Sequence, residues 1–298
     1  MGGGRETPSA TLRPVTAPQE FPRVQATSRG RLGVQVGVVP PVRGEPTPLP
    51  GGVVQSPTTA GSKRAVASSA IRHVLLDADG VLQVVPDDDW YALAEPFVGD
   101  RAREFLHRAW EMERPALAGQ GDFLPLLADL LVQFGVDASA DEVFAEAWCR
   151  VAPVPATVAL VGALRGNGYG VHLGTNQDAN RAAFLRTAFG YDELFDTSCY
   201  SCELGVAKPE ATFFVEAARR IGAAPETILF VDDSLANVEG ARAAGMPAIH
   251  WTVRDGHDAL LDLLAKHGVD GRSWRGGGEA CPAQVPREVA QVVEHEQG

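Results

Sequence analysis

The sequence contains few cysteines and no long hydrophobic run. Four of its 298 residues are cysteine, namely Cys149, Cys199, Cys202 and Cys281, which is too few for a disulfide scaffold in a chain of this length. No stretch reaches the roughly 18 apolar residues that a transmembrane helix needs. The N-terminus also lacks the compact apolar segment of a secretory signal. We therefore expect a cytoplasmic protein that makes no contact with membranes.

Basic side chains are scarce beyond residue 70. Residues 71–298 contain 18 Lys/Arg against 35 Asp/Glu, whereas residues 1–70 contain eight against three. Nucleic acids and anionic membranes select clustered lysine and arginine, so this acidic part is unsuited to either. A phosphorylated small molecule remains compatible if a metal ion and a few amides supply local positive charge. Nothing in the composition favours a particular oligomeric state.

The first 70 residues lack the periodic apolar pattern of a folded domain. They hold ten of the 21 prolines and are rich in Gly, Ser and Thr. Such a segment buries too little apolar surface to offset the entropy lost on ordering. We predict a disordered extension over residues 1–70, with a start codon placed too far upstream or a transit peptide as the alternatives, and a loose Gly-rich tail over residues 272–298.

Short apolar runs alternate with helical patterns from Ile71 onward. The runs are Ile71–Leu76, Gly170–Gly174, Leu194–Tyr200, Ile228–Val231 and Pro247–Trp251. The helical patterns are Ala156–Arg165, Ala179–Phe189, Glu210–Ile221, Leu235–Ala244 and Ala259–His267. Alternation at these lengths predicts a doubly wound α/β fold with a parallel, Rossmann-like sheet. We assign residues 71–82 and 153–271 to this fold.

Residues 83–152 interrupt the alternation. They show no strand pattern, and their helical periodicity falls in three segments, Val98–Trp110, Phe123–Phe134 and Asp141–Arg150. We therefore predict a helical insertion between the first strand and the rest of the sheet.

Polar residues follow the ends of the predicted strands. They are Asp77-Ala78-Asp79-Gly80, Thr175-Asn176 and Asp232-Asp233-Ser234. Lys208 precedes Pro209, a residue well suited to the first position of a helix. Ligands of open α/β sheets bind beyond the carboxyl ends of the strands. We expect these side chains to converge in one crevice there.

This set of side chains suits phosphoryl transfer. A carboxylate nucleophile needs a cation to reduce its repulsion with a phosphate dianion, and clustered carboxylates bind Mg²⁺. Lys208 and backbone amides would bind further phosphate oxygens. Thr175 would bind another at the start of its helix, where the helix dipole favours anions. We assign Asp77 as nucleophile and Asp79, two residues later, as general acid and base.

Four segments resemble the motifs of the haloacid dehalogenase-like (HAD) phosphohydrolase superfamily. HVLLDADGVL is similar to its nucleophile strand, VHLGTNQ to its threonine segment, GVAKPE to its lysine segment and LFVDDSLANVEGARAAGM to its acidic metal segment. The resemblance covers about residues 71–268. It implies that residues 83–152 form a helical cap over the active site that selects substrates.

The resemblance also implies a role for each matching residue. Asp77 and Asp232 would supply carboxylate oxygens to Mg²⁺, and Asp79 would supply its backbone carbonyl. The residues expected to bind the substrate phosphate are Gly80, Thr175, Asn176 and Lys208. Asp233 would act through metal-bound water or by orienting Lys208. Ser234 and Asn237 would orient the metal ligands without binding the metal themselves.

The leading function is Mg²⁺-dependent hydrolysis of a small phosphorylated metabolite through an aspartyl-phosphate. A phosphomutase would carry the same four motifs, and a non-catalytic protein that binds a phosphorylated ligand is a further alternative. The acid at position 79 disfavours a dehalogenase, whose leaving halide needs no proton. The absence of lysine between Gln83 and Ala152 disfavours phosphonate cleavage through a cap Schiff base.

A few residues outside the motifs are also candidates for function. Trp90, Arg101 and Glu113 in the cap are candidates for substrate contact. His172 lies within a strand pattern, and we interpret it as a core residue. We interpret Cys199 and Cys202 as incidental thiols, because no second pair or nearby histidine completes a zinc site.

Overall fold

The computed structural model describes residues 70–272. The predictions for the N-terminal extension and the C-terminal tail fall almost entirely outside this range. Within residues 70–272, no helix combines the length and apolar character needed to cross a membrane.

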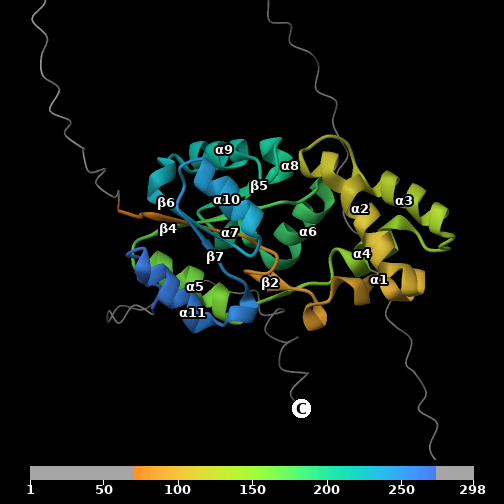
Figure 1. Ribbon diagram of the computed structural model, residues 1–298, viewed down its shortest axis with the longest axis horizontal. Coiled ribbons are helices and arrows are strands. Elements are labelled where there is room, and N and C mark those ends of the chain that lie inside the picture. The colour runs from red at the N-terminus through yellow and green to blue at the C-terminus, as the bar shows by residue number, and fades with distance from the viewer. Residues whose placement is uncertain (1–69, 273–298) are drawn as a thin grey trace, which may run out of the picture. The chain divides into compact units, whose positions relative to one another are not determined.

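Five parallel strands form the central sheet, in the order β5-β4-β1-β6-β7 (Figure 1). Their bounds are His73–Leu76 (β1), Gly170–Thr175 (β4), Thr197–Tyr200 (β5), Ile228–Asp232 (β6) and Ala248–His250 (β7). From β1 the chain adds β4 and β5 on one side, and then β6 and β7 on the other. The order therefore reverses beside β1, which is where open α/β sheets bind their ligands.

Helices cover both faces of this sheet, with α9 and α10 on one side and α5 and α11 on the other (Figure 1). The helices after the cap are α5 (Pro155–Gly166), α6 (Ala179–Phe189), α7 (Tyr191–Leu194), α8 (Ser201–Leu204), α9 (Ala211–Ile221), α10 (Leu235–Ala243) and α11 (His257–Lys266). Two short 3₁₀ helices, η3 (Pro225–Thr227) and η4 (Val253–Asp255), lie among them. This arrangement confirms the predicted doubly wound, Rossmann-like fold.

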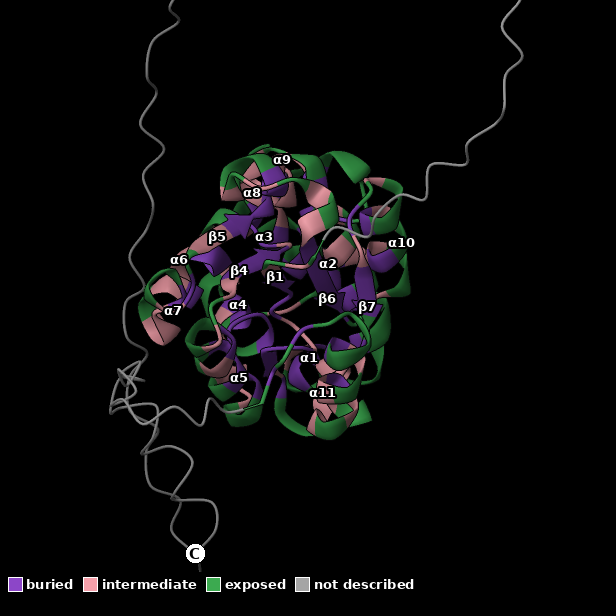
Figure 2. Ribbon diagram, turned by 90° about the vertical axis from the view of Figure 1, so that its left-hand side faces the viewer, coloured by how far each residue is buried: buried purple, intermediate pink, exposed green. Residues whose placement is uncertain are grey.

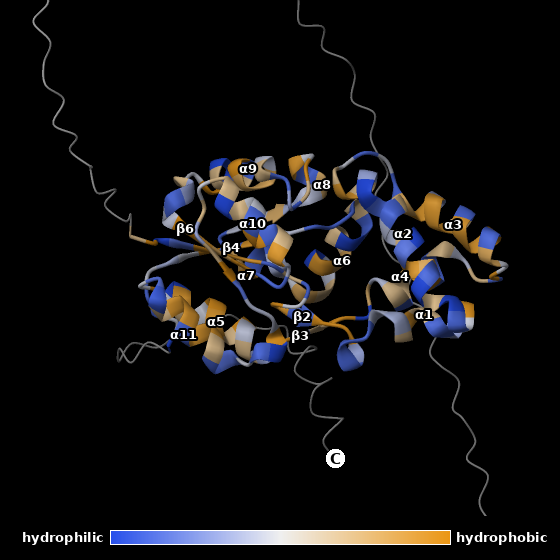
Figure 3. Ribbon diagram, in the orientation of Figure 1, coloured by the Kyte–Doolittle hydropathy of each residue, from blue (hydrophilic) through white to orange (hydrophobic). Residues whose placement is uncertain are grey.

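The strands are apolar on both faces because helices bury both. Val74 and Leu76 pack in the core beneath α5 and α11, whereas Leu75, between them, packs against α9 and α10. Figure 2 shows the buried strands between more exposed helices. In Figure 3 the strands are largely hydrophobic, whereas the helices carry both hydrophobic and hydrophilic residues. A continuous apolar run is typical of a parallel strand buried in this way.

The insertion consists of four helices with a core of their own. They are α1 (Trp90–Val98), α2 (Ala102–Leu117), α3 (Phe123–Phe134) and α4 (Ala140–Ala147), with 3₁₀ helices η1 (Pro86–Asp88) and η2 (Gly99–Arg101) before and after α1. Phe105, Phe123 and Leu127 are fully buried between them. We call residues 83–152 the cap.

Two features of the cap differ from the sequence prediction. Gln83–Val84 (β2) pairs antiparallel with Ala152–Pro153 (β3), so the interval does contain strands, at both of its ends. A strand of two residues carries no periodic signal, and its pairing joins distant parts of the chain. Helix α1 was also not predicted, because Pro96 lies inside it and breaks the expected pattern.

Candidate active site

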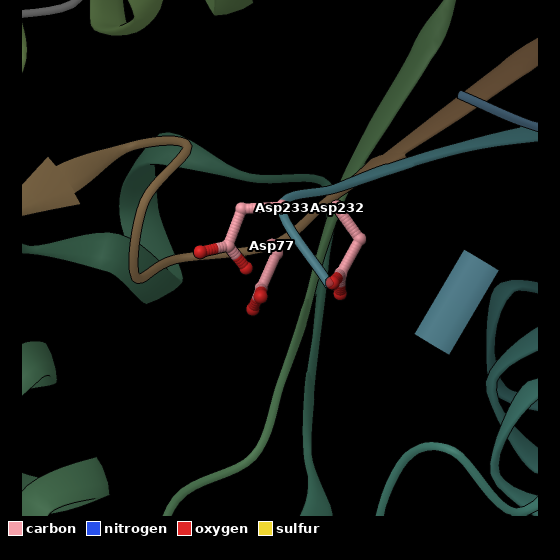
Figure 4. A group of neighbouring side chains, drawn as sticks. All are labelled: Asp77, Asp232 and Asp233. Carbon is pink, nitrogen blue, oxygen red and sulfur yellow. The ribbon is translucent and has the colours of Figure 1, made fainter. Parts of the chain in front are cut away.

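Three carboxylates gather beyond the ends of β1 and β6. Asp77 follows β1, Asp232 ends β6 and Asp233 comes next. One carboxylate oxygen from each lies within 4.8 Å of the others (Figure 4). The strand register explains why Asp77 and Asp232 are neighbours. Leu76 of β1 pairs with Val231 of β6, and Asp77 and Asp232 are the residues that follow this pair. Asp77 is 6% exposed and Asp232 is fully buried.

Lys208 contributes a positive charge to this group. Its Nζ lies 2.7 Å from Asp77 Oδ1 and 2.7 Å from Asp232 Oδ2, and it donates to the carbonyl of Gly174 at 3.0 Å. Burial acts to lower the pKa of Lys208, but the carboxylates of Asp232 and Asp77 outweigh it and raise the pKa. Lys208 is therefore an ammonium. The structure brings it together with Asp77 and Asp232 as the sequence predicted.

The negative charge around Asp77 is only partly neutralised. Burial and the nearby Asp232 raise the pKa of Asp77 well above its usual value, although Lys208 acts against this. Burial and Asp232 also raise the pKa of Asp233 to about 6. Buried carboxylates are stable together only when cations or hydrogen bonds compensate them. The donor set, all carboxylate oxygen, suits a hard divalent cation such as Mg²⁺.

Two side-chain amides hold Lys208 and Asp232 in place. Asn176 donates from Nδ2 to the carbonyl of Lys208 at 2.9 Å, and its Oδ1 accepts from the Lys208 amide at 2.8 Å. Asn237 Nδ2 donates to Asp232 Oδ1 at 2.9 Å, and the backbone N–H of Ser234 donates to the same oxygen at 2.8 Å. In this structure Asn176 positions the lysine, whereas the sequence assigned it to phosphate binding.

Gly80 allows the turn after β1 to pass close to Asp233. Its φ is +73°, a left-handed conformation that disfavours other residues, and a Cβ there would lie 2.3 Å from Asp233 Oδ2. This position therefore requires glycine for steric reasons, beside any contact its amide makes with phosphate.

Two residues that the sequence analysis placed at helix starts lie elsewhere. Thr175 is the last residue of β4, 1% exposed, and α6 begins only at Ala179 with Asp178 as its N-cap. Its hydroxyl Oγ1 accepts from Gln177 Nε2 at 2.8 Å. Pro209 does not open a helix either, since α9 begins at Ala211. Thr175 therefore ends a strand and Lys208 lies in the turn before α9, where its ammonium reaches Asp77 and Asp232.

Asp79 is paired with an arginine that the sequence analysis missed. Arg181 NH1 lies 2.6 Å from Asp79 Oδ2, and NH2 lies 2.8 Å from Oδ1. Gln83 and Gln177 donate to the same carboxylate at 2.8 and 3.2 Å. Burial acts to raise the pKa of Asp79, but Arg181 and these hydrogen bonds lower it overall. The sequence held one indication that Arg181 has an acidic partner. Arg181 lies in the first turn of α6, where the helix dipole disfavours a cation.

A cavity of about 260 Å³ adjoins Asp79. It is lined by Asp79, Trp90, Trp110, Glu113, Leu117, Trp148, Asn176 and Arg181. Two of the cap residues that the sequence suggested, Trp90 and Glu113, are therefore at the cavity. The third, Arg101, instead stacks on the ring of Phe134 and donates to its carbonyl.

The remaining sequence interpretations concern residues away from the cavity. His172 is 3% exposed and lies 3.1 Å from His73, Nε2 to Nδ1, so its interpretation as a core residue is confirmed. Cys199 is buried and Cys202 is half-buried; both are free thiols, and neither belongs to the acidic group.

A model of one protein family matches residues 71–245, and its description is haloacid dehalogenase-like hydrolase. The chain belongs to the haloacid dehalogenase-like hydrolase family. The resemblance that the four sequence motifs suggested is thereby confirmed.

Two curated relatives in this family are phosphatases. The sesquiterpene phosphatase of Aspergillus oryzae is 35% identical over 89 residues, which is 30% of this chain and 45% of that protein. The phosphoglycolate phosphatase of Escherichia coli is 30% identical over 103 residues, which is 35% of this chain and 41% of that protein. The chain thus matches less than half the length of either relative.

Solved structures of the family share the fold. A HAD family enzyme from Bacteroides thetaiotaomicron superposes with a TM-score of 0.56 at 19% identity, covering 64% of this chain and 98% of that one, and it was also crystallised with magnesium. A predicted HAD-like hydrolase from Porphyromonas gingivalis gives a TM-score of 0.55 at 22% identity, covering 66% and 98%. At these identities the likeness supports the architecture.

Proposed function

We propose that this protein hydrolyses the phosphate monoester of a small metabolite through an aspartyl-phosphate on Asp77. The observation that carries the proposal is the position of Asp77, whose Oδ1 lies 2.7 Å from the Lys208 ammonium beside two further carboxylates. The phosphatase relatives support the same reaction class.

The contacts of Asp77 prepare one oxygen for attack. The backbone N–H of Ala78 donates to Oδ1 at 2.7 Å, and Lys208 contacts the same atom. Both donors hold the carboxylate from one side, which orients Oδ2 as the nucleophile. Fixing a nucleophile in this way lowers the entropic part of the barrier.

The carboxylates of Asp77, Asp232 and Asp233, with the backbone carbonyl of Asp79, would hold Mg²⁺. When bound, Mg²⁺ would neutralise charge on the phosphoryl oxygens and reduce their repulsion with Asp77. The family neighbour crystallised with magnesium supports this cofactor. Lys208 supplies further positive charge to the substrate phosphate and orients the carboxylates of Asp77 and Asp232.

Asp79 completes the reaction by moving protons. In the first step Asp77 forms a bond to phosphorus, the ester P–O bond breaks, and protonated Asp79 gives its proton to the leaving oxygen. In the second step carboxylate Asp79 takes a proton from water, which attacks phosphorus and frees Asp77 and phosphate. The ion pair with Arg181 stabilises the carboxylate form of Asp79, which the second step requires, so the protonated form that the first step requires is the minor one.

Phosphate release from p-nitrophenyl phosphate and from a panel of phosphorylated metabolites, with Mg²⁺ present, tests this function. We expect turnover by the protein, none by Asp77→Asn, and an unchanged rate for Asp129→Asn, an exposed acid of α3. Transfer of phosphate between hydroxyls without release would indicate a mutase instead. Ligand binding without either reaction would indicate a binding protein.

A further inference from the structure

Three of the eight residues that line the cavity beside Asp79 are tryptophans. Trp90 and Trp110 meet edge to face with their ring centroids 6.5 Å apart, and Trp148 and Leu117 add further apolar surface. Asp79, the proposed proton donor to the leaving oxygen, is also part of the lining. A phosphate held at Asp77 would therefore direct the organic part of the ester into this cavity.

The arginine in the cavity wall is already engaged by the protein. Its Nε donates to the carbonyl of Trp148 at 2.7 Å, both terminal nitrogens bind Asp79, and one of them also donates to Gln177 at 3.0 Å. Arg181 is 5% exposed. A guanidinium with these partners has little capacity left for an anionic group on a substrate.

The other lining residues add no cation. The cap contains no lysine between Gln83 and Ala152. Glu113 is buried and accepts from the indole N–H of Trp148 at 3.1 Å. Burial and the nearby Asp178 raise the pKa of Glu113 to about 8, which favours its uncharged form at neutral pH. An anion entering the cavity would lose its hydration without gaining a partner.

We propose that the cavity selects monophosphates of uncharged aromatic or other apolar alcohols and disfavours leaving groups that carry a carboxylate. This inference rests on the proposed phosphatase function and narrows its substrate class. Flat apolar groups gain contact with the tryptophan rings, whereas a carboxylate is left unpaired.

Benzyl phosphate and para-carboxybenzyl phosphate form a matched pair for the test, because their leaving alcohols are similar and only one carries a second anion. We expect kcat/KM for benzyl phosphate to be higher by about tenfold or more, since an unpaired buried charge is strongly disfavoured. Equal values, or a preference for the carboxylated ester, would overturn the inference while leaving the phosphatase function intact.

A second measurement tests the cavity itself. Trp110→Ala should lower the ratio of kcat/KM for benzyl phosphate to that for ethyl phosphate by about tenfold, as one aromatic contact is lost. Leu117→Trp, which fills the cavity, should lower the same ratio. Val132→Ala, at a site 78% exposed on α3, should leave it unchanged.

The outcomes of the two measurements are distinct. An unchanged ratio in both Trp110→Ala and Leu117→Trp, with melting temperatures showing that the variants are folded, would contradict the assignment of the cavity. If the protein released phosphate from none of these esters, nor from p-nitrophenyl phosphate, the phosphatase function would fail and the inference with it.

Discussion

Arg181 donates hydrogen bonds to both carboxylate oxygens of Asp79, at 2.6 and 2.8 Å, while its Nε donates to the carbonyl of Trp148 at 2.7 Å. One guanidinium therefore connects Asp79, in the turn after β1, with Trp148, the C-cap residue of α4 in the cap. Burial acts to lower the pKa of Arg181, but Asp79 outweighs it and raises the pKa. Bidentate pairs of this kind are among the strongest hydrogen-bonded contacts in proteins.

This pair should show strong coupling in a double-mutant cycle. Arg181→Met leaves the half-buried carboxylate of Asp79 without its cation, and Asp79→Asn leaves the buried guanidinium of Arg181 without its anion, so each should destabilise the protein by about 3 kcal/mol. The double variant should be less destabilised than the sum by about 1–3 kcal/mol. Urea denaturation measures the free energy of unfolding of the two single variants and of the double variant.

The exposed pair Arg219–Glu216 provides the control. Its Nε–Oε2 distance is also 2.7 Å, but the arginine side chain is 73% exposed. Its coupling should stay within about 0.5 kcal/mol, because water screens surface pairs. Coupling between Arg181 and Asp79 as small as this would contradict the structural role of their contact.

Asp79→Asn should slow hydrolysis of alkyl phosphates by about 10²- to 10⁴-fold, the usual contribution of a general acid and base. The backbone carbonyl offered to the metal is retained, so the loss reports on the proton. With p-nitrophenyl phosphate the decrease in rate should be smaller, because p-nitrophenolate leaves without a proton. This comparison applies when formation of the aspartyl-phosphate is the rate-limiting step. An equal loss for both esters would argue against proton donation by Asp79.

Removal of divalent cations should abolish turnover. EDTA leaves Lys208 to face the three carboxylates of Asp77, Asp232 and Asp233 without a divalent cation, and Mg²⁺ should restore activity. Ca²⁺ should restore little, because it prefers more ligands and a looser geometry. Asp232→Asn should raise the Mg²⁺ concentration needed for half-maximal activity and reduce the rise in melting temperature on adding Mg²⁺. Full turnover in excess chelator would exclude this metal role.

Much of the fold follows from local signals in the sequence. The helices α3 (Phe123–Phe134) and α6 (Ala179–Phe189) were predicted with the bounds that the structure shows. In both, an aspartate caps the first turn and a left-handed glycine follows the last residue, which are Asp122 with Gly135 and Asp178 with Gly190. Such caps fix helix ends locally. Periodicity and caps together therefore suffice to predict the bounds of these two helices from the sequence.

The site was predictable only where strand ends carry its residues. Asp77 and Asp232 converge because the neighbouring parallel strands β1 and β6 end at one edge of the sheet, and Lys208 reaches them from the turn before α9. Arg181 reaches Asp79 across 102 residues of sequence, from a position set by how α6 packs. The β2–β3 ribbon likewise pairs Gln83 with Pro153, 70 residues further along the chain. Pairings of this kind depend on tertiary geometry, which a single sequence does not reveal.

Gly240→Ala should damage both stability and activity. A Cβ at this position of α10 would lie 2.1 Å from the carbonyl oxygen of Pro209 and 3.0 Å from its carbon. Relief requires backbone movement in the segment that carries Lys208, so we expect a loss of about 1–3 kcal/mol in stability and a lower kcat. Gly162→Ala in α5 is the control, because nothing lies within 4 Å of its Cβ. It should stabilise the protein by about 0.5–1 kcal/mol, and similar effects at the two sites would refute the close approach.

The buried His172 should make stability depend on pH. Burial, with a smaller contribution from His73, lowers the pKa of His172 from 6.5 to about 4. The unfolded chain therefore binds more protons than the folded one between these values, and stability rises with pH in this range. The contribution is complete above about pH 6.5 and is lost as the pH falls toward 4. A shift of this size corresponds to about 3 kcal/mol.

Other groups titrate in the same range, so the comparison must be between variants. We expect the difference in unfolding free energy between the protein and His172→Leu to change by about 3 kcal/mol from neutral pH to pH 4, with the protein losing more stability on acidification. His107→Gln, at an exposed histidine of α2, should follow the unmodified protein. If urea denaturation showed parallel pH profiles for His172→Leu and the unmodified protein, the folded protein would protonate His172 as readily as the unfolded chain, which would contradict the effect of its burial at 3% exposure.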